Sequence, residues 1–234
     1  MWAGMLLFRQ IGGEDWYLRA MSSWMVNLFS FMAFGVAIAQ LLARRNWIRQ
    51  QRQGFQLPLL DGDSETLILP NDAVECRRRI RDLPEPKRRL LLVELLSAAL
   101  QRSRANWSAE DASAAVQGQA ELVQVRTDSE YAMVRYLAWA IPAIGFIGTV
   151  LGIGQAMAAL RHLSGDSGID PIDEATSALH LAFDTTFVAL VLSLVLMFLM
   201  HRIQASDDKL IVRAADWCLR RFVYRMHIPK ETRP

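Results

Sequence analysis

Three long apolar runs limit what this chain can fold into. Each is near the roughly 20 residues that a helix needs to cross the hydrocarbon core of a bilayer, and basic side chains follow each run closely, at Arg44, Arg161 and Arg202. Backbone groups inside a bilayer must be satisfied within the segment, which for single runs of this length means a helix. We therefore predict an all-α membrane protein with three transmembrane helices, over residues 22–43, 136–160 and 178–200.

The placement of charge predicts how these helices are oriented. Basic residues cluster after the first and third runs, whereas the segment between the second and third runs is mainly acidic. Because basic loops remain on the cytoplasmic side, the acidic loop and the N-terminus are expected in the periplasm and the C-terminus in the cytoplasm of a bacterial inner membrane. The expected organisation is a periplasmic or interfacial N-terminus (1–21), a first span (22–43), a cytoplasmic helical region (44–135), a second span (136–160), a periplasmic acidic loop (161–177), a third span (178–200) and a cytoplasmic helical tail (201–234).

The cytoplasmic region is predicted to contain long helices that extend from the spans. Apolar residues at helical spacing predict short helices over 71–83 and 86–104. Ser108 is expected to open a further helix, with acidic residues in its first turn, that runs without interruption into the second span. The tail is expected to continue the helix of the third span.

Composition excludes several classes of function. The net charge is +2 and basic residues are interleaved with acidic ones, whereas a nucleic-acid-binding domain carries a clustered basic excess. The two cysteines form no C-x-x-C, the four histidines are scattered, and there is no phosphate loop, nucleophile elbow or zinc-binding H-E-x-x-H. We expect no nucleic-acid partner, no cofactor, no metal site and no enzymatic activity.

Small residues gather on one face of the second run. At about 100° per residue they share roughly a third of the circumference, opposite large apolar side chains. Such a stripe permits close approach of another helix, and by itself it favours simple helix packing. The residues on this face are Pro142, Gly145, Gly148, Thr149, Gly152, Ala156 and Ala159.

The third run has a comparable stripe, on which Ala182, Thr186, Ala189 and Ser193 share a face. One interpretation is that Thr185 and Thr186 only bond to carbonyls of their own helix. The other is that two threonine-centred stripes in adjacent spans form a shared polar seam. A hydroxyl both donates and accepts, so such a seam could hold water or pass a proton without carrying charge.

Two ionisable residues of the third run lie on the side opposite Thr186. His180 and Asp184 are four residues apart, a spacing that allows an ion pair on one helix or a contact with a neighbouring helix. Asp184 is a further candidate for handling transported protons.

Two motifs resemble those of the MotA/TolQ/ExbB proton channel family. The pattern P-x-x-G-x-x-G-T-V-x-G over 142–152 resembles the family's second span, and A-x-x-T-T over 182–186, followed by Ala189 and Leu190, resembles its third. The predicted topology, with a large cytoplasmic insertion after the first span and a short outer loop, is similar as well.

This resemblance implies a ring-shaped homo-oligomer, commonly of five copies, around two single-span partner helices. Each partner carries a membrane-embedded aspartate whose protonation and release is coupled to rotation within the ring. Carried over by position, Thr149 and Thr186 would line the interior near that aspartate. Thr185, Asp184 and Ser193 are the further candidates for the ion pathway. The implied packing and pore positions are Pro142, Gly145, Gly148, Gly152, Ala182 and Ala189.

The leading hypothesis is therefore a proton-channel stator subunit. With a single-span ExbD/TolR/MotB-like partner, it would convert the proton motive force into mechanical work across the envelope. The alternative is a non-conducting membrane scaffold, sensitive to bulk at Gly148 or Gly152 but indifferent to the threonine hydroxyls.

Overall fold

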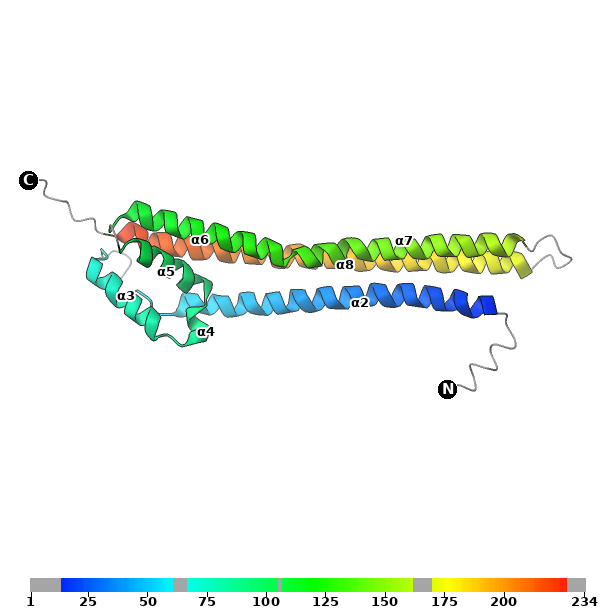
Figure 1. Cartoon of the computed structure of the whole chain (residues 1–234), viewed down its shortest axis with the longest axis horizontal. Coiled ribbons are helices and arrows are strands. Elements are labelled where there is room, and N and C mark those ends of the chain that lie inside the picture. The colour runs from blue at the N-terminus through cyan, green and yellow to red at the C-terminus, as the bar shows by residue number, and fades with distance from the viewer. Residues whose placement is uncertain (1–13, 61–66, 105–106, 162–169, 227–234) are drawn as a thin grey trace, which may run out of the picture. The chain divides into compact units, whose positions relative to one another are not determined.

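The computed structural model describes residues 14–60, 67–104, 107–161 and 170–226 (Figure 1). These ranges are helical apart from short connections, and their one β contact is an isolated bridge between Ile68 and Met226. The elements are α2 (Glu14–Gln51), η1 (Arg52–Gln56), α3 (Pro70–Asp82), α4 (Glu85–Arg88), α5 (Leu91–Arg102), α6 (Ala109–Glu130), α7 (Ala132–Leu160), α8 (Asp170–Arg221) and η3 (Val223–Arg225).

Three helical stretches are long and apolar enough to cross a membrane: Trp24–Gln56, Ala109–Leu160 and Pro171–Arg225. The predicted spans 136–160 and 178–200 lie inside two of these stretches, and the span 22–43 overlaps the third from Trp24 onward. The prediction of an all-α protein with three membrane-fit helices is therefore confirmed for the described part of the chain. The exact limits of the spans and their sidedness stay predictions.

The chain divides into two compact units. The first, which we call the span unit, comprises residues 1–41 and 132–201. The second, which we call the helical insertion unit, comprises residues 42–131 and 202–234. Helices α2 and α8 each contribute residues to both units.

The helical insertion unit is built around α5. Leu95, Leu96 and Ala99 of this helix have no exposed surface, and they belong to a core completed by α3, α6 and the last part of α8. Ser108 caps α6 as predicted, since its hydroxyl accepts the backbone N–H of Asp111. The unit therefore has the large apolar core that is typical of a water-soluble domain.

One predicted helix is divided in the structure, and another is continuous apart from a single turn residue. The helix expected over 86–104 is divided, because α4 ends at Arg88 and α5 starts at Leu91. The side chain of Gln51 accepts the buried N–H of Leu91 at 2.7 Å, so a tertiary contact sets the start of α5. The helix expected to run from Ser108 into the second span is present as the helical stretch Ala109–Leu160, in which the single turn residue Tyr131 separates α6 from α7 and its N–H still bonds the Thr127 carbonyl.

The other predicted helices lie close to their expected limits. The helix predicted over 71–83 is α3, which begins at Pro70, where a missing N–H costs little. Asp72 accepts the N–H of Leu69 and stabilises this end. The tail continues the third span as predicted, since α8 runs without a break from Asp170 to Arg221.

Candidate functional site

Close packing of α7 against α8 positions the candidate site in the span unit, where the two helices run side by side (Figure 1). A methyl group added at Gly145 would collide with Ala189, and one added at Gly152 would collide with Ala182. Both contacts are tighter than real side-chain carbons adopt, so only glycine permits this separation of the helices. The small residues predicted for packing therefore lie where α7 and α8 meet.

Gly148, the third glycine of the stripe, shows on which side of the α7–α8 pair α2 lies. A methyl group at Gly148 would meet Thr185 of α8 and Val26 of α2. Thr185 is 1% exposed, and its hydroxyl donates to the Ala182 carbonyl of its own helix at 2.8 Å. Its hydroxyl is thus engaged within α8, as one of the two interpretations of this residue anticipated.

Thr149 and Thr186 behave differently, because their hydroxyls join the two helices. The hydroxyls of Thr149 and Thr186 hydrogen-bond each other, and Thr186 also lies 2.9 Å from the Gly145 carbonyl of α7. A carbonyl only accepts, so the Thr186 hydroxyl can donate to Gly145, and the Thr149 hydroxyl can donate to Thr186 or to the Ala182 carbonyl of α8 at 3.5 Å. We call this hydrogen-bonded chain the threonine seam.

The threonine seam lies at the margin of the helix contact that faces away from α2. Thr149 follows Gly148 and Thr186 follows Thr185, each by one residue and about 100°, and a methyl group at Gly148 would meet both Thr185 and Val26. Both threonines are half-buried, whereas Thr185 is fully buried. The seam is thus open to a group outside this chain, which a hydroxyl can bind as donor or acceptor.

Ser193 and Pro142 form a second link between α7 and α8. Pro142 lies inside α7 and lacks the N–H that would bond the carbonyl four residues earlier, that of Ala138. The buried Ser193 hydroxyl donates to this Ala138 carbonyl at 2.8 Å. A polar side chain of one helix thereby satisfies the backbone group that a proline frees in the other.

The remaining predicted pathway residue lies apart from the threonine seam. Asp184 pairs with His180 at 3.2 Å, and the side chains are 56% and 79% exposed. They project from the side of α8 opposite the residues that pack on α7, so the single chain does not bring Asp184 to Thr149 or Thr186.

A family model matches residues 88–215, more than half of the chain, and is described as the MotA/TolQ/ExbB proton channel family. The matched range includes α5, α6, α7 and most of α8, and with them both threonine motifs. The chain belongs to this family. No curated protein and no solved structure matches it. Membership confirms the resemblance and the general assignment as a proton-channel-type membrane protein, whereas α2 lies outside the matched range.

In this MotA/TolQ/ExbB family member, a buried ionic cluster of the helical insertion unit was missed by the sequence analysis. Asp207 of α8 has no exposed surface, and one of its carboxylate oxygens accepts from Arg44 and from the Tyr131 hydroxyl, the latter at 3.2 Å. Arg44 also pairs with Glu130 and donates to Thr127. Burial, and then the charge of Asp207, raises the pKa of Tyr131, so it remains a neutral donor.

Nothing local in the sequence marks this cluster. Arg44 directly follows an apolar run, which is typical of a basic residue that flanks a membrane span. In the structure its guanidinium also lies 4.0 Å from the centroid of the Trp47 ring. The partner Asp207 is 163 residues away in the chain. The one sign in the sequence that this carboxylate is buried is the position of Asp207 on the helical wheel, on the same side as apolar residues of α8.

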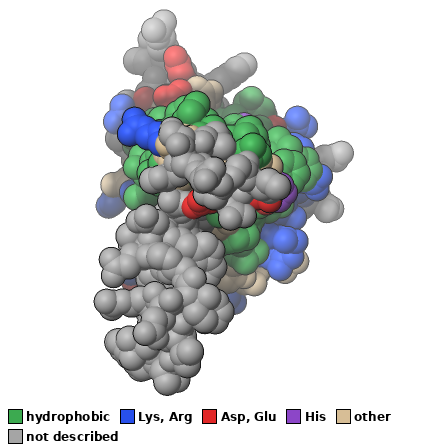
Figure 2. Space-filling model, turned by 90° about the vertical axis from the view of Figure 1, so that its right-hand side faces the viewer, with side chains coloured by type: hydrophobic (Ala, Val, Ile, Leu, Met, Phe, Trp, Pro, Cys, Tyr) green, Lys and Arg blue, Asp and Glu red, His purple; other side chains and the backbone are tan. Residues whose placement is uncertain are grey.

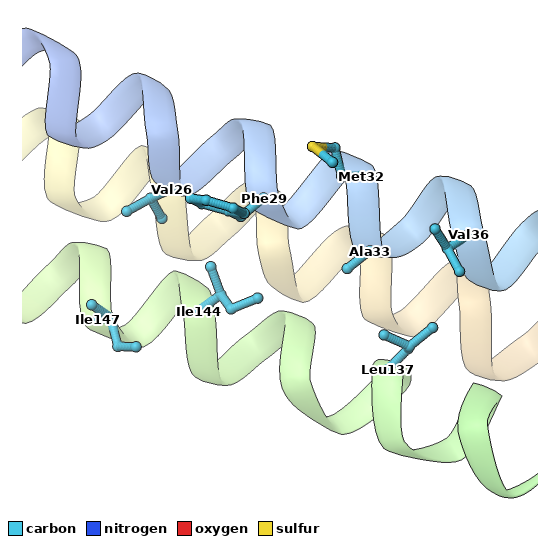
Figure 3. Close-up of a pocket in the computed structure, with 8 residues that line it drawn as sticks. All are labelled: Val26, Phe29, Met32, Ala33, Val36, Leu137, Ile144 and Ile147. Carbon is cyan, nitrogen blue, oxygen red and sulfur yellow. The ribbon is translucent and has the colours of Figure 1, made fainter.

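One groove between α2 and α7 is lined by apolar side chains. Apolar side chains of α2 and α7 line a groove of about 460 Å³ (Figure 3), namely Val26, Phe29, Met32, Ala33, Val36, Leu137, Ile144 and Ile147. An ion in this groove would lack any side-chain ligand. The threonine seam is consequently the better candidate for ion handling in the span unit.

Neither metal nor thiol chemistry is supported by the described residues. No group of three or more His, Cys, Asp and Glu side chains among them could hold a metal ion. Cys76 and Cys218 are buried free thiols, and burial raises the pKa of Cys218 to about 12. A thiol with such a pKa stays protonated and unreactive at neutral pH.

Proposed function

We propose that this protein is the channel-forming stator subunit of a proton-driven machine in the bacterial inner membrane. Several copies, about five, surround two single-span partners that carry a membrane-embedded aspartate. The N-terminus is periplasmic, the C-terminus is cytoplasmic, and the complex converts the proton motive force into mechanical work. The protein itself catalyses no covalent chemistry.

The threonine seam is the observation that carries this proposal. An ionised carboxylate costs at least about 2.5–3.5 kcal/mol at the centre of a bilayer. The hydroxyls of Thr149 and Thr186 are half-buried and lie away from α2, so they can donate to such a carboxylate without adding charge. When the carboxylate is protonated, the same hydroxyls return to each other and to the Gly145 carbonyl.

The packing of α7 on α8 supports the mechanical part of the proposal. Glycines and alanines bring α7 and α8 so close together that the two helices present one continuous surface to a partner helix. A partner helix can then turn against this surface while the hydroxyls of Thr149 and Thr186 keep their positions. Proton binding and release at the partner would bias its orientation.

The test is proton flux through the complete complex. The protein is purified with its partner, the copies are counted by native mass spectrometry, and flux is measured in vesicles that contain a pH-sensitive dye. Thr186→Val and Thr149→Val preserve shape but remove a hydroxyl, and each is expected to reduce flux at least about tenfold, the effect of about 1.4 kcal/mol. Thr149→Ser keeps the hydroxyl and is expected to retain most of the flux.

The matched control is Thr176→Val, since the exposed Thr176 bonds only to the Ile172 carbonyl of its own helix in the described structure. Full flux in both valine variants would contradict the proposal. It would favour the scaffold alternative, for which the tight contacts at Gly145 and Gly152 are the supporting observation. A scaffold would lose assembly when bulk is added there and would conduct no protons in any variant.

A further inference from the structure

One side of the chain carries an unbalanced positive charge just after the first predicted span, at Arg45, Arg49 and Arg52. All three residues are exposed, and at about 100° per residue they lie within about 60° of one another around the helix axis. We call them the arginine face. The sequence has no Asp or Glu between Asp15 and Asp61, so α2 offers no counter-charge beyond its first turn.

The rest of the described chain does not neutralise the arginine face either. None of its three guanidinium groups has an ion pair or a hydrogen bond with another described residue. The adjacent Arg44 differs, because it is paired with Asp207 and Glu130. Like charges one helical turn apart repel each other, so an anion from outside the chain would stabilise the arginine face.

Helix geometry places the arginine face near the level of lipid phosphates. The helix α2 is continuous to Gln51 (Figure 1), and its predicted span ends at residue 43. At 1.5 Å per residue, Arg45, Arg49 and Arg52 follow the hydrocarbon core by about 3, 9 and 14 Å. The headgroup region is about 5–8 Å thick on each side of a bilayer. Side chains of a helix lean toward its N-terminus, which for this face is the direction of the span, so the guanidinium groups extend back toward the headgroups.

Apolar surface adjoins the arginine face on the side of the span. Leu42 is 56% exposed, and it precedes Arg45 by three residues and Arg49 by seven, so it lies on the same side of α2. In the view of Figure 2, Lys and Arg side chains border the hydrophobic surface of the described residues. A phospholipid has its groups in the same order, with apolar tails followed by a phosphate.

We infer that the arginine face is a binding site for anionic phospholipids, whose phosphate groups it contacts. Guanidinium N–H groups pair with phosphate oxygens, and basic residues beside a span attract anionic lipids. A zwitterionic headgroup brings a positive charge of its own to the arginines, so the site is expected to prefer a headgroup with net negative charge. The inference rests on the predicted end of the first span, and it needs neither the ring nor the partner of the proposed function.

Native mass spectrometry of the full chain tests the inference. The protein is released from micelles that contain equal amounts of phosphatidylglycerol and phosphatidylcholine. It is expected to retain phosphatidylglycerol preferentially, in a number per copy that saturates as the lipid is increased. The double variant with Arg45→Gln and Arg49→Gln is expected to retain at least about fivefold less phosphatidylglycerol. Its retention of phosphatidylcholine is expected to stay the same.

The matched control is the double variant with Arg213→Gln and Arg221→Gln. Both residues are exposed on α8, about 20 and 32 Å beyond the predicted end of the third span at residue 200. This variant loses the same charge far from the headgroups and is expected to retain phosphatidylglycerol like the unmodified protein. Both double variants replace exposed side chains, so both are expected to unfold like the unmodified protein in detergent without added lipid.

A conservative variant shows whether charge is responsible. Arg45→Lys with Arg49→Lys keeps both positive charges and is expected to retain most of the phosphatidylglycerol. A loss as large as that of the glutamine variant would attribute retention to the shape of arginine and would overturn the electrostatic inference.

Three further outcomes would overturn the inference. Equal retention of both lipids by the unmodified protein would show that headgroup charge is not recognised. Equal losses in the glutamine variant and in the α8 control would show a general effect of net charge. Release of phosphatidylglycerol by inorganic phosphate would assign the arginine face to a soluble anion. Proton flux in a protein that shows no lipid preference would support the channel and overturn the lipid site, whereas lipid preference without flux would do the reverse.

Discussion

The span unit and the helical insertion unit distribute their side chains in opposite ways. In the insertion unit, large residues such as Leu95 and Leu96 are fully buried. In the span unit many of the buried positions of α7 and α8 are glycine, alanine, threonine and serine, beside a few larger residues such as Ile141 and Leu196, while Phe187 and Trp139 are 68% and 70% exposed. The core of the insertion unit is therefore built mainly from large apolar side chains, whereas the contact between α7 and α8 uses mostly small ones.

The difference follows from the solvent each unit is suited to. In water, burial of apolar area drives association, so large side chains are most useful inside. In lipid the tails are as apolar as leucine, and helices associate through close contact and hydrogen bonds instead. The two units also differ in the polar groups that they bury: the insertion unit buries an ion pair, whereas the α7–α8 contact uses neutral hydroxyls.

The largest effect is expected from removing the buried positive charge in the insertion unit. Arg44→Gln leaves Asp207 buried without its partner, which is expected to lower the free energy of unfolding by about 3–5 kcal/mol. Denaturant unfolding in mild detergent measures this change. Arg45→Gln, at the exposed neighbouring position, is the control and is expected to change it by less than about 0.5 kcal/mol.

Simultaneous replacement of both charges sharpens this comparison. Arg44→Met with Asp207→Leu is expected to recover most of the loss, because no uncompensated charge remains. A double variant as unstable as Arg44→Gln would mean that the pair holds the unit together through its geometry and not merely through charge balance.

Added volume is expected to have the next largest effect, and only in the span unit. Gly152→Ala inserts a methyl group into Ala182 and is expected to cost about 1–3 kcal/mol or to dissociate α7 from α8. Gly35→Ala of α2, where a methyl group meets nothing within 4 Å, is the matched control and is expected to be neutral or slightly stabilising. Thermal unfolding of both variants in detergent checks this, and equal stability would refute the close contact.

A smaller effect is expected at the link between Ser193 and Pro142. Ser193→Ala leaves the Ala138 carbonyl without its hydroxyl donor and is expected to cost about 1–3 kcal/mol, at the lower end if water reaches the site. In a Pro142→Ala background the helix regains its own N–H donor, so the cost of Ser193→Ala is expected to shrink. Additive effects in this double-mutant cycle would show that the two residues act separately.

The last prediction concerns alkaline pH and only the insertion unit. The pKa of Cys218 is raised from 9.0 to about 12, so above pH 9 the unfolded chain loses a proton that the folded chain keeps. The contribution of this thiol to stability is complete below pH 9 and is lost progressively as the pH rises toward 12. Cys218→Ala is expected to flatten the decline in unfolding free energy over that window, and an unchanged slope would argue against a buried thiol.

The sequence predicted the helices better than their limits. Ser108 was identified as a helix cap from its own position and the acidic residues after it, which is local information. The turn residue at Tyr131 and the start of α5 at Leu91 were missed, and Gln51, which accepts the N–H of Leu91, lies 40 residues away in the chain. Helix periodicity carries no record of such contacts.

The candidate site, too, could be predicted from the sequence only in part. Helical spacing alone grouped Gly145, Gly148 and Gly152 on one face, and the motif resemblance selected Thr149 and Thr186. Helical spacing also placed Thr186, and not Thr185, on the stripe of the third run, but it could not show that Thr185 bonds within α8 and Thr186 bonds to α7. The direction of each side chain, about 100° apart, makes the difference.

By itself, then, the sequence determined that this chain forms three helices long and apolar enough for a bilayer, and which of their faces are small or charged, because length and periodicity are properties of single segments. Tertiary structure alone decided that Thr186 bonds Gly145, that Ser193 satisfies the carbonyl freed by Pro142, and that Arg44 neutralises Asp207. Each of these contacts joins residues on different helices, and their pairing depends on how closely and in what register those helices pack.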